Sequence, residues 1–520
     1  TICHEHLEYY ALTQIITIAD MANLKIIDVK FNSSNGGSFR IYFCKKESKQ
    51  FEECAELLEH LLKEEEKYDI KNPLTYKNFI NKCDTELKKL TDVLNIIKQN
   101  GQTAYLLGAS TKGNCVLQYC NINENYVKYA VERNPEKIGR CTSTGVEIIG
   151  EETMRNSPPD YLIVLPWHFR DEIIKREHKF LENGGKLIFY FPNFEIISSK
   201  PKTLITGCDG FIGNYVKKEM KHDSLFGITK NNNKNESNIL KFFMNMNNYE
   251  ELERIIEIIN PDNIIHLASI SSSIDAFNNP IETLKNNGML TAVLCDIILR
   301  VNKNIRLFNA SSSEIYKGHQ KYFIDENEER SINNTNHLHP YSIAKIMGQN
   351  IVKFYRKTHN LHLSNGIIFT SQSKEKSNKF LLNKVANHIK EWNNQSPQEP
   401  LVLGDLSSYR NIIHPFDIAS AINVILNTDF GDDYCICSNN SYSIFSLVEM
   451  LYKKANIELT QKNDNTYYDY NTNKTVLIIE KTNNGLDNSQ ININASPKKL
   501  FNINWDIKYN IDFIMAEMLK

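Results

Sequence analysis

Apolar residues change their spacing along the chain, and the change separates segments of different predicted structure. Within 1–50, a helical stretch precedes residues 24–31 and 39–44, where apolar and polar residues alternate around a glycine turn. That alternation predicts a β-hairpin. Residues 51–100 carry apolar residues three and four positions apart, which is the spacing of amphipathic helices.

Short apolar stretches alternate with helical patterns in two series beyond residue 103. The first series predicts a small parallel α/β sheet within 51–197. Its apolar stretches are 104–107, 127–131, 161–165 and 186–190. After a linker at 198–201, the second series continues through 201–520 and ends in a smaller mixed tail, 431–520. We therefore predict an α/β protein with two doubly wound parallel-sheet domains in tandem.

Composition and charge exclude several classes of protein. The 60 lysines and arginines against 62 aspartates and glutamates leave a net charge of −2, which argues against a basic nucleic-acid binder or a disordered chain. No apolar stretch approaches the roughly 20 residues of a membrane span. The 11 cysteines form no CxxC pair, so reduced thiols in a cytoplasmic protein are expected rather than disulfides or a metal cage. The start at Thr1, without a signal segment, favours the C-terminal part of a longer protein.

A phosphate cradle is predicted where strand 202–206 meets a helix. Glycines at this turn allow a pyrophosphate to approach the helix N-terminus. The residues of the turn and the helix start are Gly207, Gly210, Phe211, Ile212 and Gly213. The alternative is a tight turn with no ligand. The next strand ends in Lys230, where an NAD-selective site places an acid, so NADP is favoured over NAD unless Lys230 is only a surface lysine.

Tyr341 and Lys345 are spaced for acid–base chemistry. On a helix, residues four apart share a face, so the Lys345 ammonium can approach both the Tyr341 phenol and a cofactor. A neighbouring cation favours phenolate. Tyr341 is therefore expected to act as general base on a sugar hydroxyl while hydride passes to nicotinamide.

Four motifs in order resemble the extended short-chain dehydrogenase/reductases that modify nucleotide sugars: 206–213, 264–268, 311–316 and 341–345. The resemblance covers about 200–520 and is greatest to GDP-mannose 4,6-dehydratases, whose substrate segments match 365–410 and parts of 431–520. It implies a Rossmann-like fold, a nucleotide-sugar substrate and a homodimer. It implies further cofactor contacts at Asn245, Leu267 and Ala268, and substrate contacts at Thr370, Lys384 and Arg410. Asn245 and Thr370 replace the aspartate and asparagine of the family pattern.

Glu314 discriminates between reaction types. Oxidation at C4 acidifies the C5 proton, and a 4,6-dehydratase needs a carboxyl group to remove it and to help water leave from C6. The resemblance implies that Ser312 holds the sugar hydroxyl, that Ser313 assists elimination, and that Glu314 is the acid/base. A helix-start carboxylate is the alternative for Glu314. Simple 4-epimerases of this fold lack this glutamate, because they only remove and return a hydride. Decarboxylases of nucleotide-sugar uronates can carry one, so Glu314 narrows the choice of reaction without closing it.

Residues 1–197 carry a second set of motifs. Two histidines at 4 and 6 could bind a metal, but no further cysteine or histidine cluster supports that. Together with 35–40, 108–114, 132–135 and 165–171, residues 4–10 resemble the C-terminal half of S-adenosylmethionine-dependent sugar C-methyltransferases. The resemblance implies that 1–50 is the tail of a methyltransferase core and 51–197 its C-terminal Rossmann-like domain. It makes His6, supported by Glu5, the base at C3 of a 4-keto sugar.

The two resemblances combine into one hypothesis: an NAD(P)-dependent nucleotide-sugar 4,6-dehydratase fused to a partial C-methyltransferase, in deoxysugar biosynthesis. S-adenosylmethionine is expected to bind only if sequence before Thr1 supplies the glycine-rich core; otherwise 1–197 is a folded appendage. The runner-up is a 4-ketoreductase or epimerase that acts after methylation. A non-catalytic dinucleotide-binding scaffold is the alternative from another class.

Overall fold

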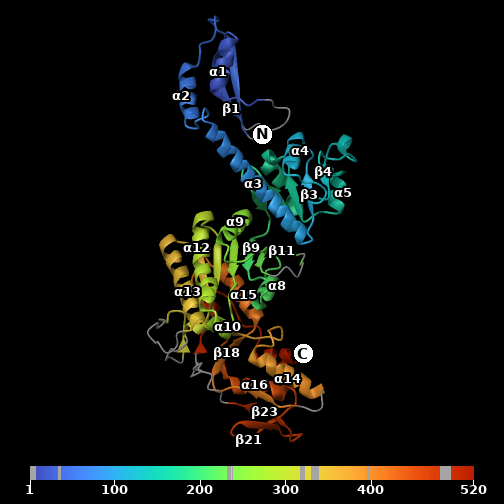
Figure 1. Ribbon diagram of the computed structural model, residues 1–520, viewed down its shortest axis with the longest axis vertical. Helices are drawn as coiled ribbons and strands as arrows, with labels where there is room; N and C mark the ends of the chain where they lie inside the picture. Colours follow the sequence, from blue (N-terminus) through green and yellow to red (C-terminus); the bar gives the residue numbers. More distant parts are fainter. Residues whose placement is uncertain are drawn as a thin grey trace. The chain divides into compact units, whose positions relative to one another are not determined.

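The computed structural model describes residues 8–32, 37–230, 236, 238–316, 323–328, 339–394, 399–480 and 494–520. The chain divides into two compact units, Thr1–Lys200 and Pro201–Lys520 (Figure 1). Among the described residues, no helix is long and apolar enough to cross a bilayer.

The first unit opens with a hairpin between two helices. Strands β1 (Leu24–Asn32) and β2 (Ser38–Lys45) pair antiparallel, as their alternating pattern predicts. Helices α1 (Leu12–Met21) and α2 (Ala55–Glu66) pack on the hairpin. The small apolar core consists of Leu12, Ala19, Ile26, Val29 and Leu58.

A long helix, α3 (Pro73–Gln99), leads into the main sheet of the first unit. The sheet has the order β5–β4–β3–β6–β7–β8, parallel except for the edge strand β8. Its strands are β3 (Ala104–Leu107), β4 (Ala130–Glu132), β5 (Ile148–Gly150), β6 (Tyr161–Val164), β7 (Lys186–Phe189) and β8 (Glu195–Ile197). Its helices are α4 (Thr111–Tyr119), α5 (Glu151–Asn156), α6 (Arg170–Arg176) and α7 (His178–Glu182). Both faces are covered, which explains why β3 and β6 are apolar throughout.

The second unit is built on seven parallel strands in the order β11–β10–β9–β12–β13–β15–β19. The strands are β9 (Lys202–Thr206), β10 (Ser224–Thr229), β11 (Ile239–Phe243), β12 (Asn263–His266), β13 (Arg306–Ser312), β15 (Leu363–Ile368) and β19 (Asp433–Ile436). The chain order reverses between β9 and β12, and ligands bind outside the carboxyl ends of the strands at such a reversal. The two parallel sheets confirm the predicted fold class.

Helices cover both faces of this sheet (Figure 1). α8 (Phe211–Glu219) and α15 (Pro415–Leu426) pack together on one face. The other face carries α9 (Tyr249–Ile259), α12 (Leu290–Val301) and α13 (Pro340–His359). Two short helices, α10 (Ser273–Asn278) and α11 (Pro280–Leu284), lie against α13.

Smaller sheets form the C-terminal part of the second unit. β16 (Thr370–Ser371), β18 (Tyr409–Ile413) and β20 (Ser441–Ser443) form one, and β14 (Phe323–Ile324) pairs with β24 (Asn494–Ala495). A third contains β17 (Leu401–Leu403), β21 (Leu459–Asn463), β22 (Thr466–Asp469) and β23 (Thr475–Ile479). The helices here are α14 (Leu381–Asn394), α16 (Ile444–Lys454), α17 (Lys498–Phe501) and α18 (Ile511–Leu519).

Candidate functional site

The glycine turn between β9 and α8 is shaped so that only glycine fits at its two ends. Gly207 has φ +71°, and a Cβ there would lie 2.9 Å from the Ala268 nitrogen. A Cβ on Gly213 would lie 2.5 Å from the Gly207 carbonyl oxygen. Helix α8 begins at Phe211 without a side-chain cap, so its first N–H groups are available to an anion. The structure therefore has the strand–turn–helix geometry that a pyrophosphate needs.

The turn is tied to the neighbouring strand β12, which is followed by Leu267 and Ala268. The Thr206 hydroxyl and His266 Nδ1 are hydrogen-bonded over 2.8 Å, and the Ala268 N–H donates to the same hydroxyl oxygen over 3.3 Å. Burial, assisted by the charge of Lys345, lowers the pKa of His266 to about 3. His266 is therefore neutral at pH 7 and serves as a hydrogen-bonding spacer between the strands.

A cluster of four charged residues behind the turn was missed by sequence reasoning. The fully buried Lys241 ammonium lies 2.8 Å from Asp209, and Lys217 lies 2.8 Å from Glu236. These contacts join the turn to β11. The sequence does carry one indication of this cluster, a single lysine, Lys241, within the apolar strand 239–243. A buried ammonium needs carboxylate partners, so such a lysine predicts an ion pair.

Lys230 and Asn245, the predicted contacts for the adenosine end of the cofactor, are both exposed. Lys230 follows β10 and Asn245 follows β11, and these two strands pair in parallel. The parallel pairing puts both residues at the carboxyl edge of the sheet, the same edge as the glycine turn. Their contact with a cofactor stays a prediction.

Tyr341 lies at the start of α13 beside the end of β13. The helix begins there because Pro340 takes its first position and His339 Nδ1 accepts the Tyr341 N–H over 3.2 Å. Burial raises the pKa of Tyr341 to about 12, more than the hydrogen bond to Ser312 lowers it, and the charge of Glu314 raises it further. Desolvation therefore favours the neutral phenol in the ligand-free protein, and the action of Tyr341 as general base stays a prediction.

Lys345 shares a helix face with Tyr341, as the spacing predicts. Its ammonium is 5.8 Å from the centroid of the Tyr341 ring and donates to the Ala310 carbonyl oxygen over 2.7 Å. Burial lowers the pKa of Lys345 to about 8. The lysine is thus positioned by the backbone of β13 rather than by the phenol oxygen.

Glu314 lies near Tyr341, on a short 3-10 turn, Ser313–Tyr316, that follows β13. The turn is held by the Glu314 N–H, which donates to Ser312 Oγ over 3.3 Å. Burial lowers the pKa of Arg410 on β18, and the negative charge of Glu314 partly opposes that shift. Glu314 is therefore near enough to Arg410 for its charge to act on the guanidinium, and the half-buried Ser313 precedes Glu314 in the same turn.

The predicted substrate residues do not all lie in the same part of the second unit. Thr370 in β16 pairs with Ile412 of β18, on the strand that carries Arg410. Lys384 is exposed on α14. Sequence reasoning missed Lys376, whose ammonium donates to the Ser371 carbonyl oxygen over 2.6 Å and lies near Phe211 of α8. Burial lowers the pKa of Lys376 to about 8.

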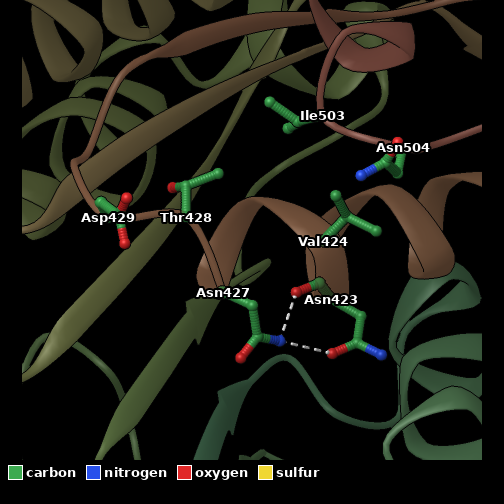
Figure 2. Close-up of a pocket in the computed structure, with 7 residues that line it drawn as sticks. All are labelled: Asn423, Val424, Asn427, Thr428, Asp429, Ile503 and Asn504. Carbon is green, nitrogen blue, oxygen red and sulfur yellow. Dashed lines mark hydrogen bonds between the residues drawn. The ribbon is translucent and has the colours of Figure 1, made fainter.

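A pocket of about 490 Å³ in the second unit lies away from these residues. Figure 2 shows it between the end of α15 and the segment after α17, lined by Asn423, Val424, Asn427, Thr428, Asp429, Ile503 and Asn504. Helix α15 ends where the Leu426 carbonyl accepts a bond from Arg306, the first residue of β13. The pocket therefore lies at the amino edge of the sheet, opposite the catalytic candidates.

Residues of three motifs of the first unit, 108–114, 132–135 and 165–171, line one pocket of about 450 Å³. Gly108 follows β3, Glu132 ends β4 and Pro166 follows β6. The Glu132 carboxylate accepts the Ala109 N–H over 3.1 Å, which joins the first two motifs. Glu5 and His6 lie outside the described residues. Among the described residues, no group of three histidine, cysteine, aspartate or glutamate side chains is placed to hold a metal.

Comparison with known proteins divides the chain near residue 200, as the two compact units do. Residues 204–518 match the family GDP-mannose 4,6 dehydratase, and residues 33–192 match the C-methyltransferase C-terminal domain. The C-methyltransferase NovU of Streptomyces niveus is 27% identical over 201 residues, 38% of this chain and 47% of that protein. The GDP-mannose 4,6 dehydratase of Drosophila melanogaster is 28% identical over 219 residues, 42% of this chain and 54% of that protein.

The chain thus spans about half the length of these two relatives. Among solved structures, UDP-glucose 4-epimerase from Bifidobacterium longum, in complex with NAD⁺ and UDP, superposes with a TM-score of 0.50 at 17% identity. The match covers 61% of this chain and 97% of the epimerase. At that identity the likeness establishes the fold.

Proposed function

Because the chain belongs to the GDP-mannose 4,6 dehydratase family through residues 204–518, we propose that its second unit removes water from a nucleotide-linked hexose in an NAD(P)-dependent 4,6-dehydration. The observation that carries the proposal is the meeting of Tyr341, Lys345 and Glu314 at the carboxyl end of β13. Tyr341 hydrogen-bonds with Ser312, and Glu314 is close enough to influence its pKa. A carboxylate beside the Tyr–Lys pair is what separates dehydration from simple hydride exchange.

The side chains divide the proton transfers of this reaction between them. The glycine turn before α8 would hold the dinucleotide, which would supply a hydride acceptor for C4 and a hydride donor for C6. Tyr341 takes the O4 proton, and Ser312 orients that hydroxyl. Glu314 removes the C5 proton and, with Ser313, delivers a proton to the hydroxyl leaving C6 as water. The proton held by Tyr341 would then pass to C5 as the hydride reaches C6. The sugar loses one water and keeps its oxidation state overall, because the C4 ketone formed is balanced by reduction at C6.

The proposal is tested by mass spectrometry of the full chain with NADP and a panel of nucleotide hexoses that includes GDP-mannose. Loss of one water from one member of the panel is the expected result, and it identifies the sugar and the base. Reduction or epimerisation of 4-keto-6-deoxy sugars without any water loss would replace the dehydratase by the ketoreductase or epimerase. Tight dinucleotide binding without turnover would favour the scaffold.

Lys230 is proposed to favour NADP by contacting its 2′-phosphate. It is exposed after β10, where a carboxylate would be needed to hold the ribose hydroxyl of NAD. Lys230→Glu is expected to weaken NADP binding by about 10- to 100-fold and to leave NAD binding unchanged, measured by titration calorimetry. The exposed Lys221, changed to Glu, is the control. Equal NADP affinity in all three proteins would make Lys230 a surface lysine.

The first unit is proposed to be the C-terminal part of a sugar C-methyltransferase, in a bifunctional cytoplasmic protein. Its support is the match over 33–192 and the pocket at the ends of β3, β4 and β6. Its chemistry would follow from the second unit, since a 4-keto sugar has an acidic C3 proton for His6 and Glu5 to remove. In a protein in which sequence before Thr1 supplies the glycine-rich core, methyl transfer from S-adenosylmethionine to the dehydrated sugar, lost in His6→Ala, is the expected result.

A homodimer is proposed through an apolar face on α11 and α13. Ile281 on α11 is 70% exposed and Ile343 in the first turn of α13 is 40% exposed, and the two helices pack against each other. Exposed apolar residues that gather on adjacent helices indicate a protein contact. The resemblance of about 200–520 to extended short-chain dehydrogenase/reductases implies that the partner is a second copy of this chain.

Ile281→Glu is expected to convert the dimer into a monomer, because a carboxylate buried at the contact lacks a partner. Light scattering after size-exclusion chromatography measures the mass. Phe430→Glu changes a 79% exposed residue elsewhere in the same unit and should leave the dimer intact. A monomeric parent protein, or a dimer that survives Ile281→Glu, would exclude this face as the contact.

A further inference from the structure

Two lysines and two carboxylates form one cluster behind the glycine turn of the second unit. The Lys241 ammonium lies 2.8 Å from Asp209 and 3.2 Å from Glu236. The Lys217 ammonium lies 2.8 Å from Glu236 and 3.4 Å from Asp209. Each cation thus contacts both anions, and the four charges cancel.

The two ammonium groups are more deeply buried than the carboxylates. Lys241 is fully buried and Lys217 nearly so, whereas the side chains of Asp209 and Glu236 are partly exposed. Burial lowers the pKa of Lys241, but its hydrogen bonds to the two carboxylates outweigh that effect and raise it, so the lysine is charged at pH 7. A buried ion pair is seldom more stable than apolar side chains of the same volume. Stability alone therefore does not explain a lysine in the apolar strand 239–243.

Asp209 belongs to the turn that would receive the pyrophosphate. It lies between Gly207 and Gly210, and Gly210 is the N-cap of α8. Burial raises the pKa of Asp209, but hydrogen bonds from Lys241 and Thr229 outweigh that effect and lower it, so the carboxylate is ionised at pH 7. The N-terminus of a helix attracts anions through its partial positive charge. An uncompensated Asp209 would therefore oppose the binding of a second anion at the same helix end.

We propose that Lys241 is a positioning residue for dinucleotide binding, which cancels the charge of Asp209 so that the N-terminus of α8 can attract a pyrophosphate. The assignment rests on the proposed NAD(P) dependence of the second unit. Lys241 is fully buried on β11, and β10 separates that strand from β9, so it acts through Asp209 and does not touch the ligand. The ion pair fixes the turn against the sheet, and the lysine keeps this anchor from repelling the ligand.

The test measures NADP affinity by calorimetric titration in the parent full chain and three variants. Lys241→Met leaves the cluster with one excess negative charge, so NADP should bind about 10-fold more weakly. Asp209→Asn leaves one excess positive charge, so NADP should bind as tightly as to the parent or more tightly. The double variant is neutral again, and its affinity should return to within about threefold of the parent value.

Unfolding temperature and an uncharged ligand separate this role from a structural one. Both single variants leave a buried charge short of a partner, so both should unfold at a lower temperature than the parent. A structural role would weaken NADP binding in both, whereas the proposed role weakens it only in Lys241→Met. Adenosine carries no phosphate, so its affinity, measured by ligand-observed NMR, should be equal in all four proteins. Lys221→Met and Asp464→Asn, at exposed residues, are the controls and should match the parent.

Weaker NADP binding in Asp209→Asn, or an equal loss of NADP and adenosine affinity in Lys241→Met, would overturn the assignment. Asp209→Asn tests it alone if Lys241→Met does not fold, because Lys241 keeps Glu236 as a partner there. A parent chain that shows the expected affinities but dehydrates no sugar would refute the dehydratase and leave the role of Lys241 standing. Dehydration by a parent chain whose two single variants both bind NADP weakly would refute the role of Lys241 and leave the dehydratase standing.

Discussion

Glu314→Gln should abolish the loss of water while oxidation at C4 continues. Glutamine keeps the size and hydrogen bonding of the side chain but cannot take the C5 proton. Tyr341 and Lys345 are untouched, so the hydride still leaves C4 and reduced dinucleotide accumulates. General acid–base catalysis contributes about 100- to 10,000-fold, and dehydration should fall by that factor. Mass spectrometry measures the product, and nicotinamide absorbance measures the trapped oxidation step.

The separation of the two steps is what distinguishes Glu314 from a helix-start carboxylate. Glu391→Gln, an exposed substitution on α14, should show parent-like dehydration and no accumulation of reduced dinucleotide. A Glu314→Gln protein that still releases water at the parent rate would exclude the dehydratase mechanism. A Glu314→Gln protein with a lower unfolding temperature and parent-like dehydration would indicate that Glu314 only stabilises the start of the helical turn.

Tyr341→Phe should abolish both steps together. The substitution removes the hydroxyl that takes the O4 proton and that hydrogen-bonds with Ser312. Without it no hydride leaves C4, so neither reduced dinucleotide nor dehydrated sugar should form, with a loss again of about 100- to 10,000-fold. The same measurements as for Glu314→Gln apply. Dinucleotide binding should persist, because the glycine turn is unchanged.

The pH profile gives Tyr341 a second test. Its pKa of about 12 in the ligand-free protein means that phenolate is scarce at neutral pH. If Tyr341 is the base, the rate of C4 oxidation should rise with pH until a group that must stay protonated is lost. Tyr470→Phe, at a residue 65% exposed and remote in sequence, should keep the parent profile. A Tyr341→Phe protein with the parent profile and rate would exclude the phenol as base.

Local patterns were sufficient for much of the fold. The alternation in 24–31 and 39–44 predicts the β1–β2 hairpin, because a half-exposed strand must alternate. The apolar stretches at 104–107 and 161–165 predict buried parallel strands, because helices cover both faces of such a sheet. Glycine at 207 and 213 could be interpreted without the fold, since turn geometry and close backbone approach are local requirements.

The candidate site was predictable only in part. The spacing of Tyr341 and Lys345 places them on one helix face, and the structure confirms it. Their electrostatics were not predictable, because burial depends on residues far away in the sequence and raises the pKa of Tyr341 instead of lowering it. The pairing of Lys241 with Asp209 and the approach of Arg410 to Glu314 likewise join segments that are distant in the chain.

By itself, the sequence determined the order of strands and helices, the glycine turn and the shared helix face of Tyr341 and Lys345, because these depend on spacing over a few positions. The tertiary structure decided which charged groups are desolvated and which face each other. Lys376 and Lys384 show the difference. Both are lysines of one segment, yet the Lys376 ammonium lies between Phe211 of α8 and Phe380, whereas Lys384 is exposed. Hydrogen bonds from Tyr215 and Asn383 hold the loop of Lys376 in this position. Desolvation depends on every neighbour at once, and no local pattern records it.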